Sequence, residues 1–386
     1  MKKLLSLALA ILMLAVMLPV VSMADEIKWE DGKNVYWQAG DTSGQTATLA
    51  EALKAAYMAK GDITITCRPD SDVGSLTHGH VADNITIIGN GAYISGGECD
   101  LEVDTYRYDR TTGKQDENGA YLEKEITITA SNLYNLGVWG QRHTNYTVNI
   151  NLTNCDSKEI SGKENVQRIY ITGTTGVNNI TVKDCDFLTT ACALYSNADG
   201  TVVIDNCTFN GGQVPVNFNH KASGAQTVTV KNCTFTNCGD ASIVYAAPVR
   251  FVNSGDGSLD ATIENNTFTG TVGNNGDILL GDYREGKESH DVTATITPNG
   301  TTKVRNSGTT DLPQTITGKV TADAKGNITR VQEEGPTTIV IISPTQDTPK
   351  TDDQKNPATG ANDLVAVAVA AAALALAGSA IILRKD

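Results

Sequence analysis

The feature that most constrains the fold is a short motif that recurs through the middle of the chain. It is clearest in "TVVIDNCTFNG" at 201–211. Seven copies share an apolar pair two residues apart, then a polar position, a turn residue and a second short strand-like piece. The intervals between copies range from 22 residues (Ile180 to Val202) to 41 residues (Ile85 to Ile126). Such self-similarity is typical of a solenoid. The first apolar residues of the copies are Ile85, Ile126, Ile150, Ile180, Val202, Val228 and Ala261.

Within each copy, β-branched residues alternate with a period of two, which is typical of strands. An Asn or Asp between two strands tolerates the left-handed backbone of a sharp turn. Stacked copies then place like residues above one another, about 4.8 Å apart. We therefore predict an all-β chain built as a parallel β-helix solenoid. Its columns are the turn residues Asp184, Asn206, Asn232 and Asn265, the cysteines Cys155, Cys185, Cys207 and Cys233, and the phenylalanines Phe187, Phe209, Phe235 and Phe268.

Two segments precede the repeats. Residues 1–24 combine two lysines, a long apolar run and the small-residue ending "SMA", which is typical of a cleaved secretory signal peptide. Residues 25–67 are predicted to form an N-terminal cap over the first coil. The cap contains a short amphipathic helix, followed by a strand at 63–67. The apolar face of that helix consists of Leu49, Ala52, Leu53, Ala56 and Tyr57.

The β-helix is predicted to span 68–283. Its longest interval, Asp100–Glu125, alternates on both sides of a turn-rich centre. This alternation suggests a projecting β-hairpin, although its mixed charges favour a solvated loop. Residues 284–342 keep strand-like pieces without the Asn-Cys signature, and we interpret them as degenerate coils and a C-terminal β cap. Residues 343–355 are rich in Pro, Thr, Asp and Lys and form a predicted linker.

The last segment, 356–386, contains the pentapeptide "NPATG", an apolar run long enough to cross a bilayer as a helix, and a basic end. This order resembles the cell-wall sorting signal of Gram-positive bacteria, with Asn356 in place of the usual Leu. The resemblance implies that a sortase cuts between Thr359 and Gly360 and joins Thr359 to peptidoglycan. It implies an exported, wall-anchored surface protein that meets the membrane only through this segment before processing. A plain single-span membrane anchor is the alternative.

The repeats over Gly61–Tyr283 resemble the right-handed parallel β-helix of the pectin lyase superfamily. This resemblance implies that the coils are right-handed. It also implies acidic residues on the third strand of each coil, either as Ca²⁺ ligands beside a basic proton acceptor or as a general acid/base pair. A likeness of fold does not by itself imply an activity.

Charge and cysteine usage narrow the classes of function. The formal net charge is −14, and such a surface repels nucleic acid and anionic membranes. Binding of an acidic polymer would need a local basic patch or bound Ca²⁺, and no metal-binding motif supports a cofactor. Eight cysteines in an exported chain suggest disulfides, but stacked neighbours lie farther apart than a disulfide prefers. We expect the Cys column to consist of buried free thiols.

The third strand of each coil carries the candidate ligand site. Its expected segments include "GVWG" (137–140), "ALYS" (193–196) and "IVYA" (243–246). If the first apolar residue of each segment points inward, the next residue points outward. An aromatic stripe in that column suggests stacking against the rings of a bound sugar. The alternative is a purely structural ladder of rings that covers this face. The expected outward column is Trp139, Tyr170, Tyr195, Asn217 and Tyr245, with His220 nearby as a hydrogen-bonding group.

Signals for catalysis are weaker. A glycosidase needs two carboxylates at the scissile bond, and the expected outward column contains none. The "HGH" at 78–80 differs in order from a hydrolase "GHG" motif and precedes the repeats. We therefore expect a wall-anchored β-helix that binds carbohydrate or a host ligand without catalysis. A displayed polysaccharide lyase or glycoside hydrolase is the alternative, and a purely structural stalk is the third.

Overall fold

The computed structural model describes residues 27–331, apart from residues 60, 78, 82, 97–99, 104–107, 110–113, 116–124, 141–146, 158–168, 173–175, 189–190, 282–290 and 307–311. The chain divides into two compact units, 1–333 and 334–386, and every described residue belongs to the first. The predicted signal peptide, linker and sorting signal therefore lie outside the described residues. Within the described part of the chain, no helix is long and apolar enough to cross a membrane.

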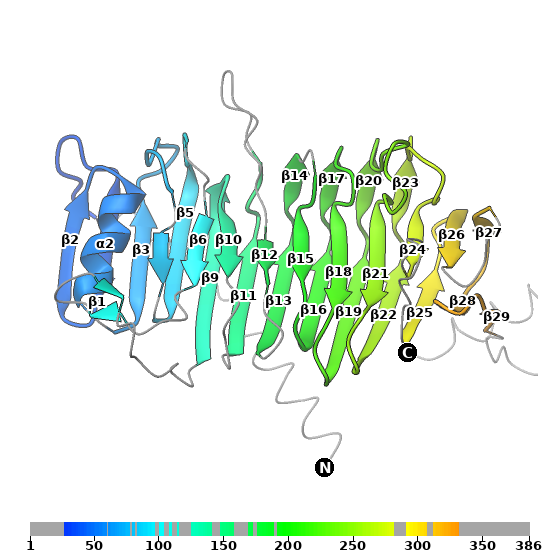
Figure 1. Cartoon of the computed structure of the whole chain (residues 1–386). Coiled ribbons are helices and arrows are strands. Elements are labelled where there is room, and N and C mark those ends of the chain that lie inside the picture. Colours follow the sequence, from blue (N-terminus) through cyan, green and yellow to red (C-terminus); the bar gives the residue numbers. More distant parts are fainter. Residues whose placement is uncertain are drawn as a thin grey trace, which may run out of the picture. The chain divides into compact units, whose positions relative to one another are not determined.

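The described residues are mainly β-strands, which distribute over three large sheets (Figure 1). The parallel strands of sheet 1 are β3 (Ile63–Cys67), β5 (Ile85–Tyr93), β9 (Glu125–Tyr134), β11 (Thr147–Thr153), β13 (Val177–Lys183), β16 (Gly200–Asp205), β19 (Ala225–Lys231), β22 (Ser258–Glu264) and β25 (Val292–Thr297). The parallel strands of sheet 2 are β4 (Gly79–Val81), β6 (Asp100–Val103), β10 (Gly137–Gly140), β12 (Ile169–Ile171), β15 (Leu194–Ser196), β18 (Val216–His220), β21 (Val249–Asn253), β24 (Ile278–Leu280) and β26 (Thr302–Asn306). Sheet 3 contains β14 (Asp186–Leu188), β17 (Thr208–Asn210), β20 (Thr234–Thr236) and β23 (Thr267–Thr269).

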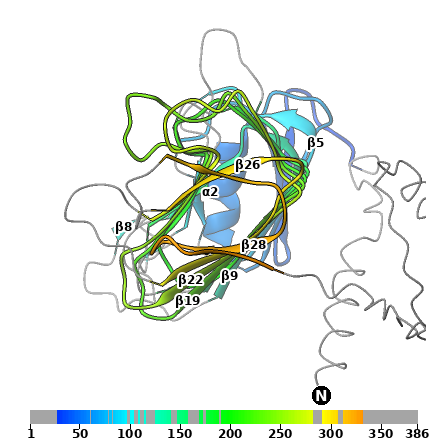
Figure 2. The same ribbon diagram turned by 90° about the vertical axis from the view of Figure 1, so that its right-hand side faces the viewer.

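In the four coils that contribute to sheet 3, one strand from each sheet makes up a coil, as in β13, β14 and β15, which are followed by β16, β17 and β18. Viewed end-on, the strands of successive coils superimpose around a shared interior (Figure 2). The prediction of a mainly β chain with long parallel sheets is confirmed, and the arrangement is consistent with a β-solenoid.

Antiparallel strands lie at both ends of the parallel stack. At the N-terminal end, β1 (Val35–Ala39) pairs with β3 and with β2 (Thr42–Thr46). At the C-terminal end, β28 (Val320–Asp323) pairs with β25 and with β29 (Ile328–Arg330). In sheet 2, β27 (Gln314–Ile316) pairs antiparallel with β26. The direction of pairing therefore changes at the first and last coils.

The register of sheet 1 corrects one assignment made from the sequence. Ile85 pairs with Ile128, and Ile128 pairs with Ile150, so Ile126 lies two residues before the column that we assigned to it. The same column begins earlier, at Ile63, and continues to Ala294. The error arose because both Ile126 and Ile128 are buried apolar residues on the inner face of β9.

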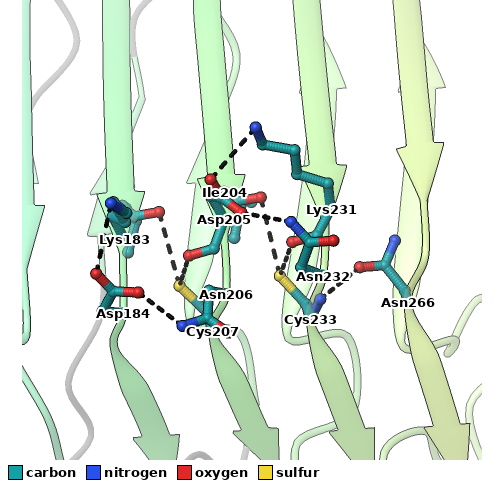
Figure 3. Close-up of polar contacts among 11 residues, drawn as sticks. Lys183, Asp184, Ile204, Asp205, Asn206, Cys207, Lys231, Asn232, Cys233 and Asn266 are labelled. Carbon is teal, nitrogen blue, oxygen red and sulfur yellow. Dashed lines mark hydrogen bonds and ion pairs between the residues drawn. The ribbon is translucent and has the colours of Figure 1, made fainter. Parts of the chain in front are cut away.

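The predicted turn residues have left-handed backbones, with φ of 53° at Asp184, 54° at Asn206, 56° at Asn232 and 54° at Asn265. Their side chains also bond between coils (Figure 3). The Asn206 amide donates to Asp184 Oδ1 over 2.7 Å, and the Asn232 amide donates to Asp205 Oδ1 over 2.9 Å. Asn is favoured at this position because it tolerates the turn and supplies a donor to the preceding coil.

The predicted Phe column forms a continuous stack in sheet 3. Ring centroids are 5.1 Å apart for Phe187 and Phe209, 4.8 Å for Phe209 and Phe235, and 5.0 Å for Phe235 and Phe268. The first three rings are buried, and Phe268 is partly buried. Stacked rings at this spacing contribute about 0.5–1.5 kcal/mol per pair beyond the burial of their area.

The predicted Cys column is buried, and its four cysteines are free thiols, as are the other three described cysteines. Burial raises the pKa of Cys155 to about 12 and the pKa of Cys67 to about 12. After Cys233, the next position of the column is occupied by the buried Asn266. Its side-chain oxygen accepts the Cys233 N–H over 2.8 Å (Figure 3). Asn266 also donates to the Val230 carbonyl over 2.8 Å.

Helix α2 (Leu49–Ala59) buries the five apolar residues predicted for its inner face. It begins with a reciprocal pair of bonds, in which Thr48 Oγ1 accepts the Glu51 N–H and Glu51 Oε2 accepts the Thr48 N–H. This capping box favours a helix start at this point. The helix packs against β1, β2, β3 and β4 and lies at the N-terminal end of the sheets (Figure 1).

The interval Asp100–Glu125 contains the predicted antiparallel pair in part, together with a strand of sheet 2 that neither interpretation of its sequence included. Its first residues, Asp100–Val103, form β6 and pair in parallel with β4 and β10. Among the described residues of this interval, β7 (Tyr108–Asp109) then pairs antiparallel with β8 (Lys114–Gln115). A strand of sheet 2 was therefore assigned to a hairpin or loop, because its charged residues hid the alternation of buried Leu101 and Val103.

Candidate functional site

The outward face of sheet 2 brings together most of the predicted ligand-binding residues. Trp139 pairs with Tyr170, Tyr170 pairs with Tyr195, and Tyr195 pairs with Asn217. Each is partly exposed and lies between two buried neighbours on its strand. Alternation along a strand therefore points all four side chains away from the core. These four residues, on β10, β12, β15 and β18, are called the stripe below.

The two tyrosines at the centre of the stripe stack directly. The rings of Tyr170 and Tyr195 have centroids 4.6 Å apart and planes inclined by 12°. Burial raises the pKa of Tyr195 above its ordinary value, and the neighbouring Tyr170 adds to the effect, while hydrogen bonds from Asn197 and Asn219 oppose it. Of these two amides, Asn219 is partly exposed and can bond to a hydroxyl group of a ligand, whereas Asn197 is only 6% exposed.

Tyr245 does not occupy the rung that the sequence suggested. The residue that pairs with Asn217 is Arg250, and Val244, which was expected to point inward, is 63% exposed. The Tyr245 ring instead covers Arg250, with the guanidinium carbon 5.0 Å from the ring centroid. The segment "IVYA" belongs to the loop between β20 and β21, and the true third strand is "VRFVN" at 249–253.

The stripe is closed at its C-terminal end. Arg250 is only 4% exposed and donates to Asn217 Oδ1 over 3.3 Å. Leu279, the next residue of the column, is fully buried. The loop above them is held down by Asn275, whose amide donates to the carbonyl oxygens of Val244 and Ala246 over 2.8 Å each. The open part of the column therefore ends at Asn217.

His220 does not face the ligand side. It is fully buried, and its ring nitrogens lie 2.7 Å from Asp199 Oδ1 and 3.3 Å from Asn253 Oδ1. On β18, His220 has the same parity as the buried Val216 and Phe218, so alternation sends its side chain inward. His220 is thus a structural residue at the corner between sheets 2 and 1.

At the N-terminal end, the column contains a carboxylate that the sequence analysis missed. Glu102 on β6 pairs with Trp139 and is partly exposed between buried Leu101 and Val103. It also pairs with His80 on β4, so Gly79 and His80 of "HGH" lie on a strand of sheet 2. The expectation that this column holds no carboxylate is therefore wrong.

The described residues contain no group of three or more His, Cys, Asp or Glu side chains placed to hold a metal ion. In the described part of the outward column, Glu102 is the one carboxylate. The arrangement offers flat aromatic faces, amide groups and a single acid at one end, which suits binding of a ligand that combines apolar faces with hydroxyl groups.

No family model matches this chain, and neither the curated proteins nor the solved structures include one that matches it.

Proposed function

We propose that this protein is anchored at the surface of a Gram-positive cell and binds carbohydrate along the stripe. The observation that carries the proposal is the register of sheet 2, which aligns Trp139, Tyr170, Tyr195 and Asn217 on four successive strands. Three aromatic rings in one open column offer a flat apolar face in a chain whose aromatic content is only 5%.

The chemistry of sugars fits such a column. Pyranose rings present axial C–H groups that pack on aromatic faces, and their hydroxyl groups bond to partly exposed amides such as Asn217 and Asn219. Successive strands are about 4.8 Å apart, which is comparable to the repeat of a linear glycan. Burial contributes about 25 cal/mol per Å² of apolar area, so a single chain binds modestly and multivalent display raises the avidity.

A glycan array on the full-length chain, purified in detergent, tests this proposal. Replacing Tyr170 and Tyr195 together by alanine is expected to abolish binding while circular dichroism stays unchanged. The matched control is Tyr36→Ala, which removes a partly exposed tyrosine from β1 in sheet 1. Unaltered binding by the folded double variant would exclude the stripe. Loss of binding together with loss of the fold would support the structural ladder.

The proposal includes wall anchoring and the finer description of the fold. We take the stack to be a right-handed parallel β-helix with α2 as its N-terminal cap, held by the linker 343–355 and the sorting signal 356–386. A sortase would join Thr359 to peptidoglycan after cutting before Gly360. Thr359→Ala is expected to move the protein from the wall fraction to the membrane or the medium. Release of the wild-type chain by detergent alone would contradict the covalent anchor.

A second candidate function is cleavage of the bound glycan, and Glu102 is the observation that favours it. A carboxylate beside Trp139 lies where a sugar on the stripe would end. Hydrolysis needs a second carboxylate, and Asp100 on the same strand is fully buried. Assays for reducing sugar and for unsaturated uronide on every glycan bound by the array separate binding from cleavage, and Glu102→Gln should remove any turnover.

A further inference from the structure

The N-terminal end of the stripe is acidic. Glu102 is the register neighbour of Trp139 and points outward from β6. Asp100, two residues earlier, lies on the same face of β6 because side chains alternate along a strand. It is fully buried and pairs with Gly137, which has no side chain of its own. Two carboxylates therefore adjoin the strand that carries the first aromatic ring.

The opposite end carries a positive charge that a ligand on the stripe does not reach. Arg250 is 96% buried beneath the Tyr245 ring and bonds to Asn217. Among the described residues of the column, Glu102 is therefore the partly exposed charge next to the open stripe. The formal charge of the whole chain, −14, has the same sign. A ligand on the stripe therefore meets the Glu102 carboxylate at the Trp139 end.

From this charge distribution we infer that the stripe selects glycans containing a sugar with a free, protonated amino group, held between Glu102 and the ring of Trp139. This inference rests on the proposed function, because the stripe must bind the other sugars of the chain. An ammonium group forms a charge-assisted hydrogen bond with a carboxylate and is attracted to the face of an indole. An N-acetylated sugar is neutral, so it loses the attraction to the indole face and the ion pair with the carboxylate, and keeps only the hydrogen bond that its amide N–H can donate.

The experiment compares two probes that differ only in acetylation. A short β-1,4-linked glucosamine oligomer and its fully N-acetylated counterpart of the same length are titrated against the full-length chain in detergent. The wild-type chain is expected to bind the amino oligomer on the order of tenfold more tightly. Glu102→Gln is expected to abolish this preference and to leave binding of the acetylated oligomer unchanged.

The matched control is Asp260→Asn, which removes the same charge from an exposed position on β22 in sheet 1. It is expected to keep the full preference. Equal binding of both probes by the wild-type chain would overturn the inference, as would an equal loss of preference in Asp260→Asn, because the selectivity would then follow net charge alone.

The two proposals fail in different ways. If the Tyr170 and Tyr195 double variant binds both oligomers as tightly as the wild type, the stripe is not the site and the proposed function falls with the inference. If that variant loses both probes while Glu102→Gln retains the preference for the amino oligomer, the proposed function stands and the role of Glu102 is overturned.

Discussion

The interior columns and the outward column of sheet 2 are aligned by the same coils, yet their composition differs. Inside, one residue type repeats from coil to coil, as in Phe187, Phe209 and Phe235. On the outer face of sheet 2 the chemistry changes along the stack, from the Glu102 carboxylate through three aromatic rings to Asn217 and the Arg250 guanidinium. Interior positions must fit the identical neighbour above and below, whereas a binding surface gains specificity from variation. A column that changes along the stack is therefore the better candidate for function.

The strongest test of this contrast removes one ring from the interior. Phe209→Ala is expected to destabilise the fold by about 3–5 kcal/mol, because it leaves a cavity between two stacked rings. Chemical denaturation followed by circular dichroism measures the loss. Leu188→Ala, at a position on β14 that is 42% exposed, serves as the control and should cost far less. Equal costs for the two variants would contradict the importance of the column.

The second test concerns the residue that ends the Cys column. Asn266→Ala should cost about 1–3 kcal/mol, since it leaves the Cys233 N–H and the Val230 carbonyl without their partner. Asn266→Cys should recover part of this loss, because a sulfur acceptor already serves the Cys155 N–H, 3.3 Å from Cys185 Sγ. Denaturation midpoints of the two variants provide the measurement. A cysteine variant less stable than the alanine variant would show that the column does not extend to this coil.

The third test uses pH. Burial raises the pKa of Cys67 from 9.0 to about 12, so its thiol ionises in the unfolded chain at lower pH than in the folded chain. Its contribution to stability is complete below pH 9 and is lost as the pH rises toward 12, at on the order of 1.4 kcal/mol per pH unit. Unfolding free energies measured across this window should fall less steeply in Cys67→Ala. Parallel slopes for the two chains would rule out this linkage.

The smallest expected effect tests whether the Tyr245 ring only covers Arg250 or also binds the ligand. Tyr245→Ala should cost about 1 kcal/mol of stability, because Arg250 loses the aromatic face above it. Glycan binding should remain, since Tyr245 lies outside the stripe. Chemical denaturation measures the change in stability, and isothermal titration with the best ligand from the array measures glycan binding. Complete loss of binding in a stable variant would return Tyr245 to the site.

Much of the interior was predictable from the sequence because burial restricts most of its positions to apolar residues, and the Cys and Phe columns each repeat one residue type over several coils. The Cys, Phe and turn columns could be aligned by inspection, and the left-handed backbones at Asn206 and Asn232 followed from the chemistry of Asn. The outward column could be predicted only where the strand ran uninterrupted, as at Tyr170 and Tyr195.

The remaining positions were missed for identifiable reasons. A loop between β20 and β21 contains "IVYA", which imitates a third strand and displaced the true one at 249–253. Glu102 lay in a charged interval whose short strand carries only two buried apolar residues, Leu101 and Val103. His220 was the avoidable error, because it continues the parity of Val216 and Phe218 and so belongs to the core.

The antiparallel strands at the two ends have a consequence for assembly. An open edge of parallel strands is a template on which another molecule of the same protein can add its own coils. Here the first and last coil strands of sheet 1, β3 and β25, are each covered by an antiparallel pair, β1 with β2 and β28 with β29, so among the described residues no coil strand of sheet 1 forms its open edge. Duplication of a coil between these pairs would lengthen the stack by about 4.8 Å while leaving both pairs unchanged, so the reach of the surface can evolve without a change at either end.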